Sequence, residues 1–115
     1  MSLLVKRVPI TVTAGGDDTT TVRLGPCVLR MIRVELGTLD TPDIDITEEP
    51  NAKSILSVDG VAADTDYLPT NLGSDPSGVD VVGAALPVPI LNRLVIVTAG
   101  AGNATTGEII FVYEH

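Results

Sequence analysis

Few side chains in this 115-residue chain have neighbours that would make them reactive. The only histidine, His115, is the last residue of the sequence, and the only cysteine, Cys27, lies between Pro26 and Val28 with no histidine nearby. A nucleophile needs a base close to it, and a zinc site needs several histidine or cysteine ligands. We therefore predict that the chain is not an enzyme, that it needs no cofactor, and that Cys27 packs as a small buried hydrophobe.

Carboxylates are the one abundant chemical group, since 15 acidic residues face 7 basic ones and give a formal net charge of −8. Four acids crowd around two predicted turns and are the weak candidates for a Ca²⁺ site: Asp40, Asp43, Asp45 and Glu48. Ca²⁺ takes roughly six to eight oxygen ligands, often from one dedicated loop. Because these acids lack the spacing of such a loop, we predict a solvated acidic face and no metal centre, with bound Ca²⁺ as the alternative.

The basic residues are unevenly distributed. Five of them lie in the first third of the chain: Lys6, Arg7, Arg23, Arg30 and Arg33. Between residues 34 and 92 the single base is Lys53. Because Lys and Arg supply most of the affinity for phosphate backbones and anionic lipids, we predict no nucleic-acid partner and no membrane partner. No apolar run approaches the ~20 residues that a membrane-spanning helix needs.

The elements that must position these charges begin with a central stretch, residues 29–58. Apolar residues alternate with polar ones in two runs and recur in a third, at Ile32, Val34 and Leu36, at Ile44 and Ile46, and at Ile55, Leu56 and Val58. Turn-forming residues separate the runs at 37–43 and 48–52. A period of two with turns between is typical of half-buried antiparallel strands. We predict a three-stranded meander here.

Strand pairs are also expected on both sides of this meander. Residues 3–13 and 19–24 have the pattern of an N-terminal hairpin, and residues 90–98 and 107–114 that of a C-terminal hairpin. No sustained helical periodicity interrupts them.

These patterns predict one domain over residues 1–115. Its fold class is all-β, a small antiparallel β-sandwich that is jelly-roll-like or related, with about seven or eight strands and no long helix.

Two segments are expected to lie outside the regular sheets. Residues 1–7 could form an extended arm. Residues 68–89 contain many turn-forming residues and are expected to form a long loop, which in a compact domain is usually disordered or used for binding. Because the loop keeps apolar residues such as Leu86 and Val88, we favour an interaction loop.

The last two predicted strands are apolar at successive positions, 94–97 and 109–113. Strands of this kind are usually covered on both faces. Either the long loop or a second copy of the chain should therefore cover them. The residues predicted for such an oligomer interface are Val95, Val97, Ile109, Phe111 and Tyr113.

Three runs carry a resemblance: RVELGTLDTPDIDITEEP at 33–50, GVAADTDYLP at 60–69 and GEIIFVYE at 107–114. Their arrangement looks like that of small proteins encoded among tailed-phage virion genes. It is similar in style to capsid decoration, or cement, proteins, which are short, acidic, aliphatic β-sandwiches on the outside of the head shell. The resemblance covers nearly the whole chain.

This resemblance implies a non-enzymatic virion protein that bridges capsid subunits and stabilises the shell. Its partners would be the major capsid protein and itself, as a dimer or trimer, and it would lie on the outer capsid surface after synthesis in the host cytoplasm. The residues expected to contact the shell are Leu3, Leu4, Val5, Leu86 and Val88. The alternatives are another phage structural part, such as a head–tail, tail or fibre component, and a carbohydrate- or ligand-binding β-sandwich module.

Overall fold

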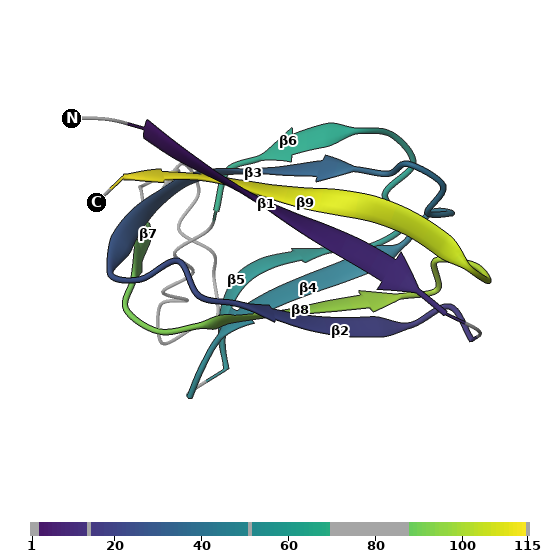
Figure 1. Ribbon diagram of the computed structural model, residues 1–115, viewed down its shortest axis with the longest axis horizontal. Helices are drawn as coiled ribbons and strands as arrows, with labels where there is room; N and C mark the ends of the chain where they lie inside the picture. The colour runs from purple at the N-terminus through teal and green to yellow at the C-terminus, as the bar shows by residue number, and fades with distance from the viewer. Residues whose placement is uncertain (1–2, 14, 51, 70–87, 115) are drawn as a thin grey trace, which may run out of the picture.

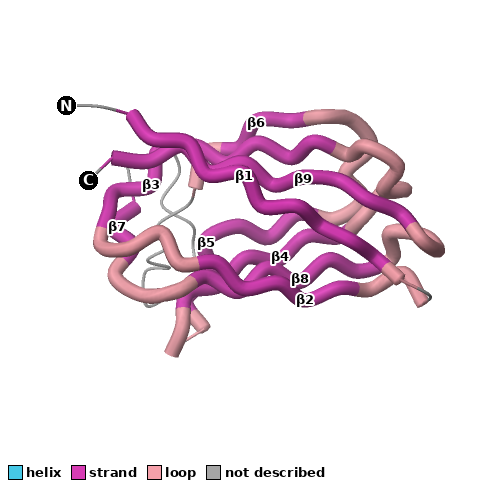
Figure 2. Tube along the Cα trace, viewed as in Figure 1, coloured by secondary structure: helices cyan, strands magenta, loops and turns pink. Residues whose placement is uncertain are grey.

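The computed structural model describes residues 3–13, 15–50, 52–69 and 88–114, and the described residues form strands and loops without a helix (Figures 1 and 2). The strands are β1 (Leu3–Val12), β2 (Asp18–Val22), β3 (Cys27–Glu35), β4 (Asp43–Glu48), β5 (Lys53–Val58), β6 (Thr65–Tyr67), β7 (Val88–Ile90), β8 (Leu94–Ala99) and β9 (Thr105–Glu114). The predicted all-β sandwich is confirmed. Nine strands are found in the described part of the chain, rather than seven or eight. None of the described residues belongs to a helix that could cross a membrane.

The strands form two antiparallel sheets that face each other, as Figure 1 shows. Sheet A has the order β1-β9-β3-β6, with β7 beside β6 on the same edge of β3, and sheet B has the order β2-β8-β4-β5. If the short β7 is set aside, β1 pairs with β9, β2 with β8, β3 with β6 and β4 with β5. This nested pairing is the strand order of a jelly roll.

Alternation of side chains builds the core between the sheets. On β1 the inward residues are Val8, Ile10 and Val12, and β9 places Ile109 and Phe111 opposite β3. Sheet B contributes branched side chains of the same kind, among them Ile44, Ile46, Leu94 and Ile96. The β-branched residues Val and Ile suit a pleated surface because their χ1 angles are already restricted. With leucine they fill a core that contains a single phenylalanine.

Two β-bulges change the alternation that the sequence pattern predicts. In β3 the register shifts between Leu29 and Met31, which leaves Arg30 on the surface instead of in the register of Ile32. In the β4–β5 pair the shift at Ile46/Thr47 lets the consecutive Ile55 and Leu56 both be buried. An extra residue in one strand reverses the facing of the residues beyond it.

The predicted hairpins are wrong. β1 pairs with β9 and β2 with β8, so the first two strands lie in different sheets, and the same is true of β8 and β9. In the central meander only β4 and β5 pair, because the chain passes from sheet A to sheet B after β3. Alternation is the same whether a strand pairs with its neighbour in sequence or with a distant strand, so periodicity could not distinguish these arrangements.

The strand predicted for residues 90–98 is divided in the structure. β7 ends at Ile90, and β8 begins at Leu94 in the other sheet. The turn between them is held by Glu48, whose carboxylate accepts hydrogen bonds from the backbone N–H groups of Leu91 and Asn92 at 2.7 and 3.0 Å. A carboxylate that accepts two such bonds fixes the point where the chain changes sheet.

Neither predicted irregular segment is wholly irregular. Residues 3–7 are not a free arm, because they pair with β9 from Leu3 opposite Glu114 to Arg7 opposite Ile110. Val88 belongs to β7, pairs with Leu29 and is fully buried. Leu86 and most of the predicted 68–89 loop lie outside the described residues.

Candidate binding surface

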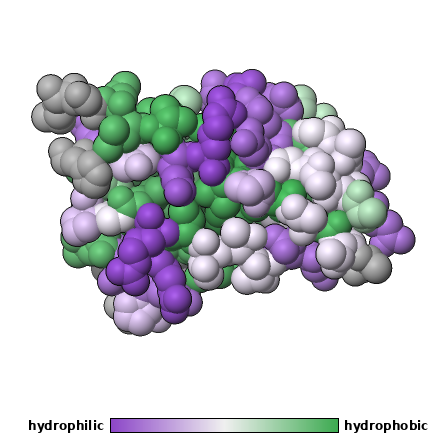
Figure 3. All heavy atoms as spheres, viewed as in Figure 1, coloured by the Kyte–Doolittle hydropathy of each residue, from purple (hydrophilic) through white to green (hydrophobic). Residues whose placement is uncertain are grey.

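The exposed part of β1 carries apolar side chains at the end of the molecule where both termini lie (Figure 1). Leu3 is 59% and Val5 58% exposed, whereas Leu4 faces the core side and is half-buried. Val5 is opposite Val112 on β9, which is in turn opposite Met31 on β3, and both are half-buried. We call Leu3, Val5, Met31 and Val112 the apolar strip. Figure 3 shows apolar surface at this end of β1.

β1 and β2 are the edge strands of the two sheets on one side of the sandwich, here called the β1–β2 side. Among the described residues β1 pairs only with β9 and β2 only with β8. Between them lies a shallow pocket of about 380 Å³, lined by Lys6 to Pro9 of β1 and by Thr20 to Arg23 at the end of β2. Apolar surface is visible there between hydrophilic patches in Figure 3.

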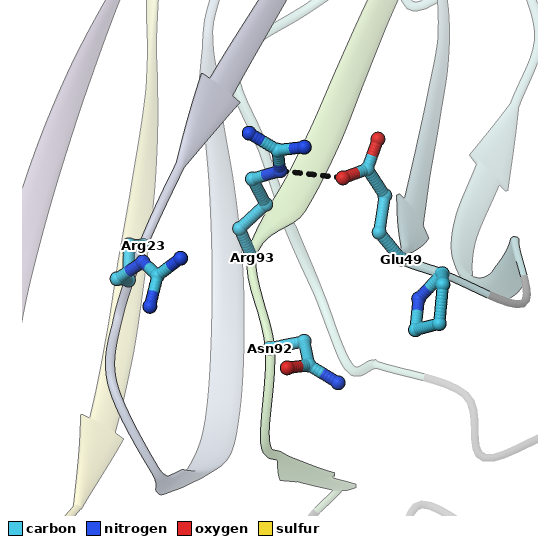
Figure 4. A pocket seen from close by; sticks show the side chains of 5 residues that line it. Arg23, Glu49, Asn92 and Arg93 are labelled. Atoms are coloured by element: carbon cyan, nitrogen blue, oxygen red, sulfur yellow. Dashed lines mark hydrogen bonds and ion pairs between the residues drawn. The ribbon is translucent and has the colours of Figure 1, made fainter.

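A second shallow pocket, of about 390 Å³, adjoins the first because Arg23 lines both. Its other walls come from two turns, Glu49 and Pro50 after β4 and Asn92 and Arg93 before β8. Figure 4 shows the Arg23 guanidinium on the opposite side of this pocket from Glu49, and Arg93 ion-paired with that carboxylate. A carboxylate from another molecule could therefore contact two arginines and an amide in this pocket.

Four of the chain's seven basic residues line these two pockets: Lys6, Arg7, Arg23 and Arg93. We call this group the basic seam. Arg7 pairs with Glu108 at 2.9 Å and Arg93 with Glu49. The side chains of Lys6 and Arg23 are exposed and make no hydrogen bond or ion pair with the described part of the chain. A positive site with unpaired bases has formed on a chain whose net charge is −8.

The sequence indicated that bases gather early in the chain but did not indicate that these four meet. Their meeting depends on β1 and β2 lying in facing sheets and on the β7–β8 turn bringing Arg93 beside Arg23. Of the residues expected to contact a shell, the structure leaves Leu3 and Val5 exposed, half-buries Leu4 and removes Val88 from the surface.

The predicted oligomer interface is not one surface. Ile109 and Phe111 point into the core, and Tyr113 packs against it. Val95 and Val97 lie on the outer face of sheet B. Of these two, Val97 is exposed and Val95 is half-buried. The run of apolar residues in β9 is continuous because Ile110, which faces outward, is also apolar. Its neighbours across the outer face of the sheet are Arg7 and Arg33.

Arginine side chains can cover an apolar residue with their stems while their charged ends stay in water. Arg33 is ion-paired with Asp66 of β6 at 2.9 Å and with Glu35 of its own strand at 3.2 Å. The hydrogen bond that Arg33 donates to Asp66 is the main reason that the pKa of Arg33 is raised. Ile110 is 5% exposed within the single chain. Burial of this residue therefore needs no second subunit.

The acids that were candidates for Ca²⁺ serve other contacts. Asp43 accepts a hydrogen bond from the backbone N–H of Gly60 at 2.8 Å, Asp45 from the hydroxyl of Ser57 at 2.6 Å, and Glu48 from the β7–β8 turn. Asp40 is exposed within the β3–β4 connection. No cluster of three or more potential metal ligands occurs among the described residues.

Cys27 lies at the start of β3 opposite Ile90 and is buried. Burial, and to a smaller extent the negative charge of Glu48, raises the pKa of its thiol. A raised pKa keeps the sulfur protonated and weakly nucleophilic at neutral pH. The expectation that Cys27 packs as a small hydrophobe agrees with its burial.

The comparisons with known proteins give no family for this chain. No protein-family model matches the sequence, and no curated protein matches it.

Proposed function

We propose that this protein is a non-enzymatic structural component of a tailed-phage virion, a capsid decoration protein that binds the outside of the head shell through its β1–β2 side. The observation that carries the proposal is the apolar strip, because Leu3 and Val5 stand exposed on an edge strand. An exposed apolar group on an unpaired edge is a typical place for another protein to bind. The basic seam beside it would set orientation and association rate.

The choice of a virion shell as the partner comes from the resemblance of the sequence runs. The jelly-roll arrangement is compatible with it, since this fold occurs in viral capsid domains, but it also occurs in lectins and cupins. The surface supplies a separate argument about the kind of function. Its two pockets are shallow and rich in arginine, and they suit contact with another polypeptide better than enclosure of a small molecule.

The proposal can be tested by co-sedimentation of the purified chain with particles of the phage whose genome encodes it, produced with this gene deleted so that its binding sites are free. The chain is expected to sediment with particles and to saturate at a fixed ratio to the major capsid protein. The Leu3→Ser/Val5→Ser variant is expected to bind at least roughly tenfold more weakly, because each apolar side chain contributes about 1.5–3 kcal/mol when fully buried.

Leu68→Ser is the matched control, because Leu68 is 57% exposed but follows β6 at the opposite edge of sheet A. It should bind like the wild type. Failure of the wild-type chain to sediment with particles would contradict the proposed function. Equal binding by all variants would show that a different surface makes the attachment.

A further inference from the structure

We propose that the basic seam recognises an acidic, extended segment of the partner protein, which lies along the free edge of β1 with its carboxylates on Lys6, Arg23 and Arg93. This inference rests on the proposed attachment through the β1–β2 side and adds the chemistry of the segment that is bound. It is carried by three independent features of that side: the backbone edge, the facing of the residues around the seam and the charges of the bases.

The backbone edge favours an extended segment. β1 has a neighbouring strand on only one side among the described residues, so its other edge offers N–H and C=O groups to an added strand. Pro9 has no N–H to give, and a proline in an edge strand places its missing donor on the free side. The usable edge is therefore the N-terminal half of β1, residues 3–8. This half carries Leu3 and Val5 of the apolar strip and the first bases.

The facing of the residues around the seam favours a bound segment in which acidic and apolar residues alternate. Val8 and Val22 are buried residues that line the pocket between β1 and β2. Lys6 has the same facing as Val8 and stands at the mouth of this pocket. Successive side chains of a strand point to opposite faces, so a strand added beside β1 that alternates acidic and apolar residues can turn its carboxylates toward Lys6 and the seam. Its apolar side chains then lie beside Leu3 and Val5 on the outer face of sheet A.

The charges favour acidic residues. Lys6 and Arg23 are exposed and unpaired within the described residues, and Arg93 is held by Glu49 alone. Arg can hold a carboxylate with two parallel hydrogen bonds. A partner carboxylate could therefore form an ion pair with Arg23, or bind Arg93 together with Glu49. The remainder of the chain is strongly acidic and would repel an acidic segment elsewhere, so the charge pattern directs such a segment to this side.

The test uses the whole chain and a fluorescent ten-residue peptide that alternates aspartate and valine, with lysine–valine and serine–valine peptides as comparisons. Anisotropy is expected to show binding of the aspartate peptide alone, with an affinity that falls as salt rises. Lys6→Gln/Arg23→Gln should weaken binding by roughly tenfold, since each exposed charge pair contributes modestly. Lys53→Gln/Arg30→Gln removes the same charge away from the two pockets and should leave binding unchanged. Thermal unfolding of both variants checks that each is folded.

Equal binding of all three peptides, or equal weakening by the two double variants, would overturn the inference. The particle assay separates it from the proposed function. If Lys6→Gln/Arg23→Gln binds particles normally while Leu3→Ser/Val5→Ser does not, the attachment stands and the acidic segment is wrong. If the aspartate peptide binds but particles do not, the seam has the proposed chemistry and the virion function is wrong.

Discussion

The two sides of the sandwich use charge in different ways. On the β1–β2 side, Lys6 and Arg23 are exposed and have no partner in the described part of the chain. On the opposite side, formed by the edge strands β5 and β6 and called the β5–β6 side, two acids at β6 are bound to other parts of the chain. Asp64 accepts a hydrogen bond from the Leu36 backbone at 2.9 Å and Asp66 pairs with Arg33 at 2.9 Å.

This difference indicates which charges hold the fold together and which are available to a partner. Carboxylates on the β5–β6 side satisfy loop N–H groups that would otherwise need water. The free bases on the β1–β2 side contribute little to folding, since removing them breaks no contact. Substitutions on the two sides should therefore affect different measurements.

The largest effect on stability is expected at Gly107, where the β3–β4 crossing packs against β9. A Cβ added at Gly107 would lie 2.7 Å from the carbonyl oxygen of Glu35 and 2.8 Å from that of Leu36. Because backbone atoms cannot move aside easily, Gly107→Ala should lower the free energy of unfolding by about 3 kcal/mol. Urea denaturation measures this. Gly60→Ala is the comparison, because its Cβ meets no atom within 4 Å and it should lose only the roughly 1–2 kcal/mol that a left-handed backbone with φ of +59° costs an alanine. Equal stability of Gly107→Ala and the wild type would contradict the packing at this crossing.

A smaller loss is expected when two acids that hold the connections around β5 and β6 are removed: Asp43 of β4, which contacts Gly60 after β5, and Asp64, which precedes β6. Asp43→Ala and Asp64→Ala should each cost about 1 kcal/mol, because the N–H groups of Gly60 and Leu36 lose their acceptor. Lys6→Ala and Arg23→Ala should change the free energy of unfolding by less than about 0.5 kcal/mol. If the two pairs of variants were equally destabilised, the contrast between the sides would be lost.

One substitution in the core between the sheets should raise the stability of the fold. The Thr98 hydroxyl is fully buried on β8 and is without a hydrogen-bond partner among the described residues. Thr98→Val keeps the shape and removes the unsatisfied group, so it should stabilise the chain by about 1 kcal/mol in thermal denaturation. Peptide binding at the basic seam should be unchanged. A destabilised valine variant would mean that the hydroxyl has a partner.

The smallest expected effect concerns pH. Since burial raises the pKa of Cys27, folding favours the protonated thiol. Its contribution to stability is fully present below the ordinary thiol pKa of about 8.5 and is lost as pH rises through the higher folded-state value. Cys27→Ala should therefore lose less stability than the wild type between neutral and alkaline pH. Parallel pH profiles of the two proteins would exclude this coupling.

The residue types and their alternation were enough to predict an all-β sandwich and the inward facing of residues such as Ile32 and Ile44. They were not enough to predict pairing. The sheet change at Leu91 depends on Glu48, which is distant in sequence, and the bulge at Arg30 depends on the register of β9. The basic seam was missed for the same reason, because it is formed only after three separate segments have been brought together by that pairing.

Hydrogen–deuterium exchange of the chain, free and bound to phage particles, tests most directly whether the β1–β2 side is the attachment surface. The account predicts slower exchange on binding in residues 3–8 of β1 and at 20–23, with no change in β5 and β6. Protection confined to the β5–β6 side, with β1 exchanging as in the free chain, would contradict it.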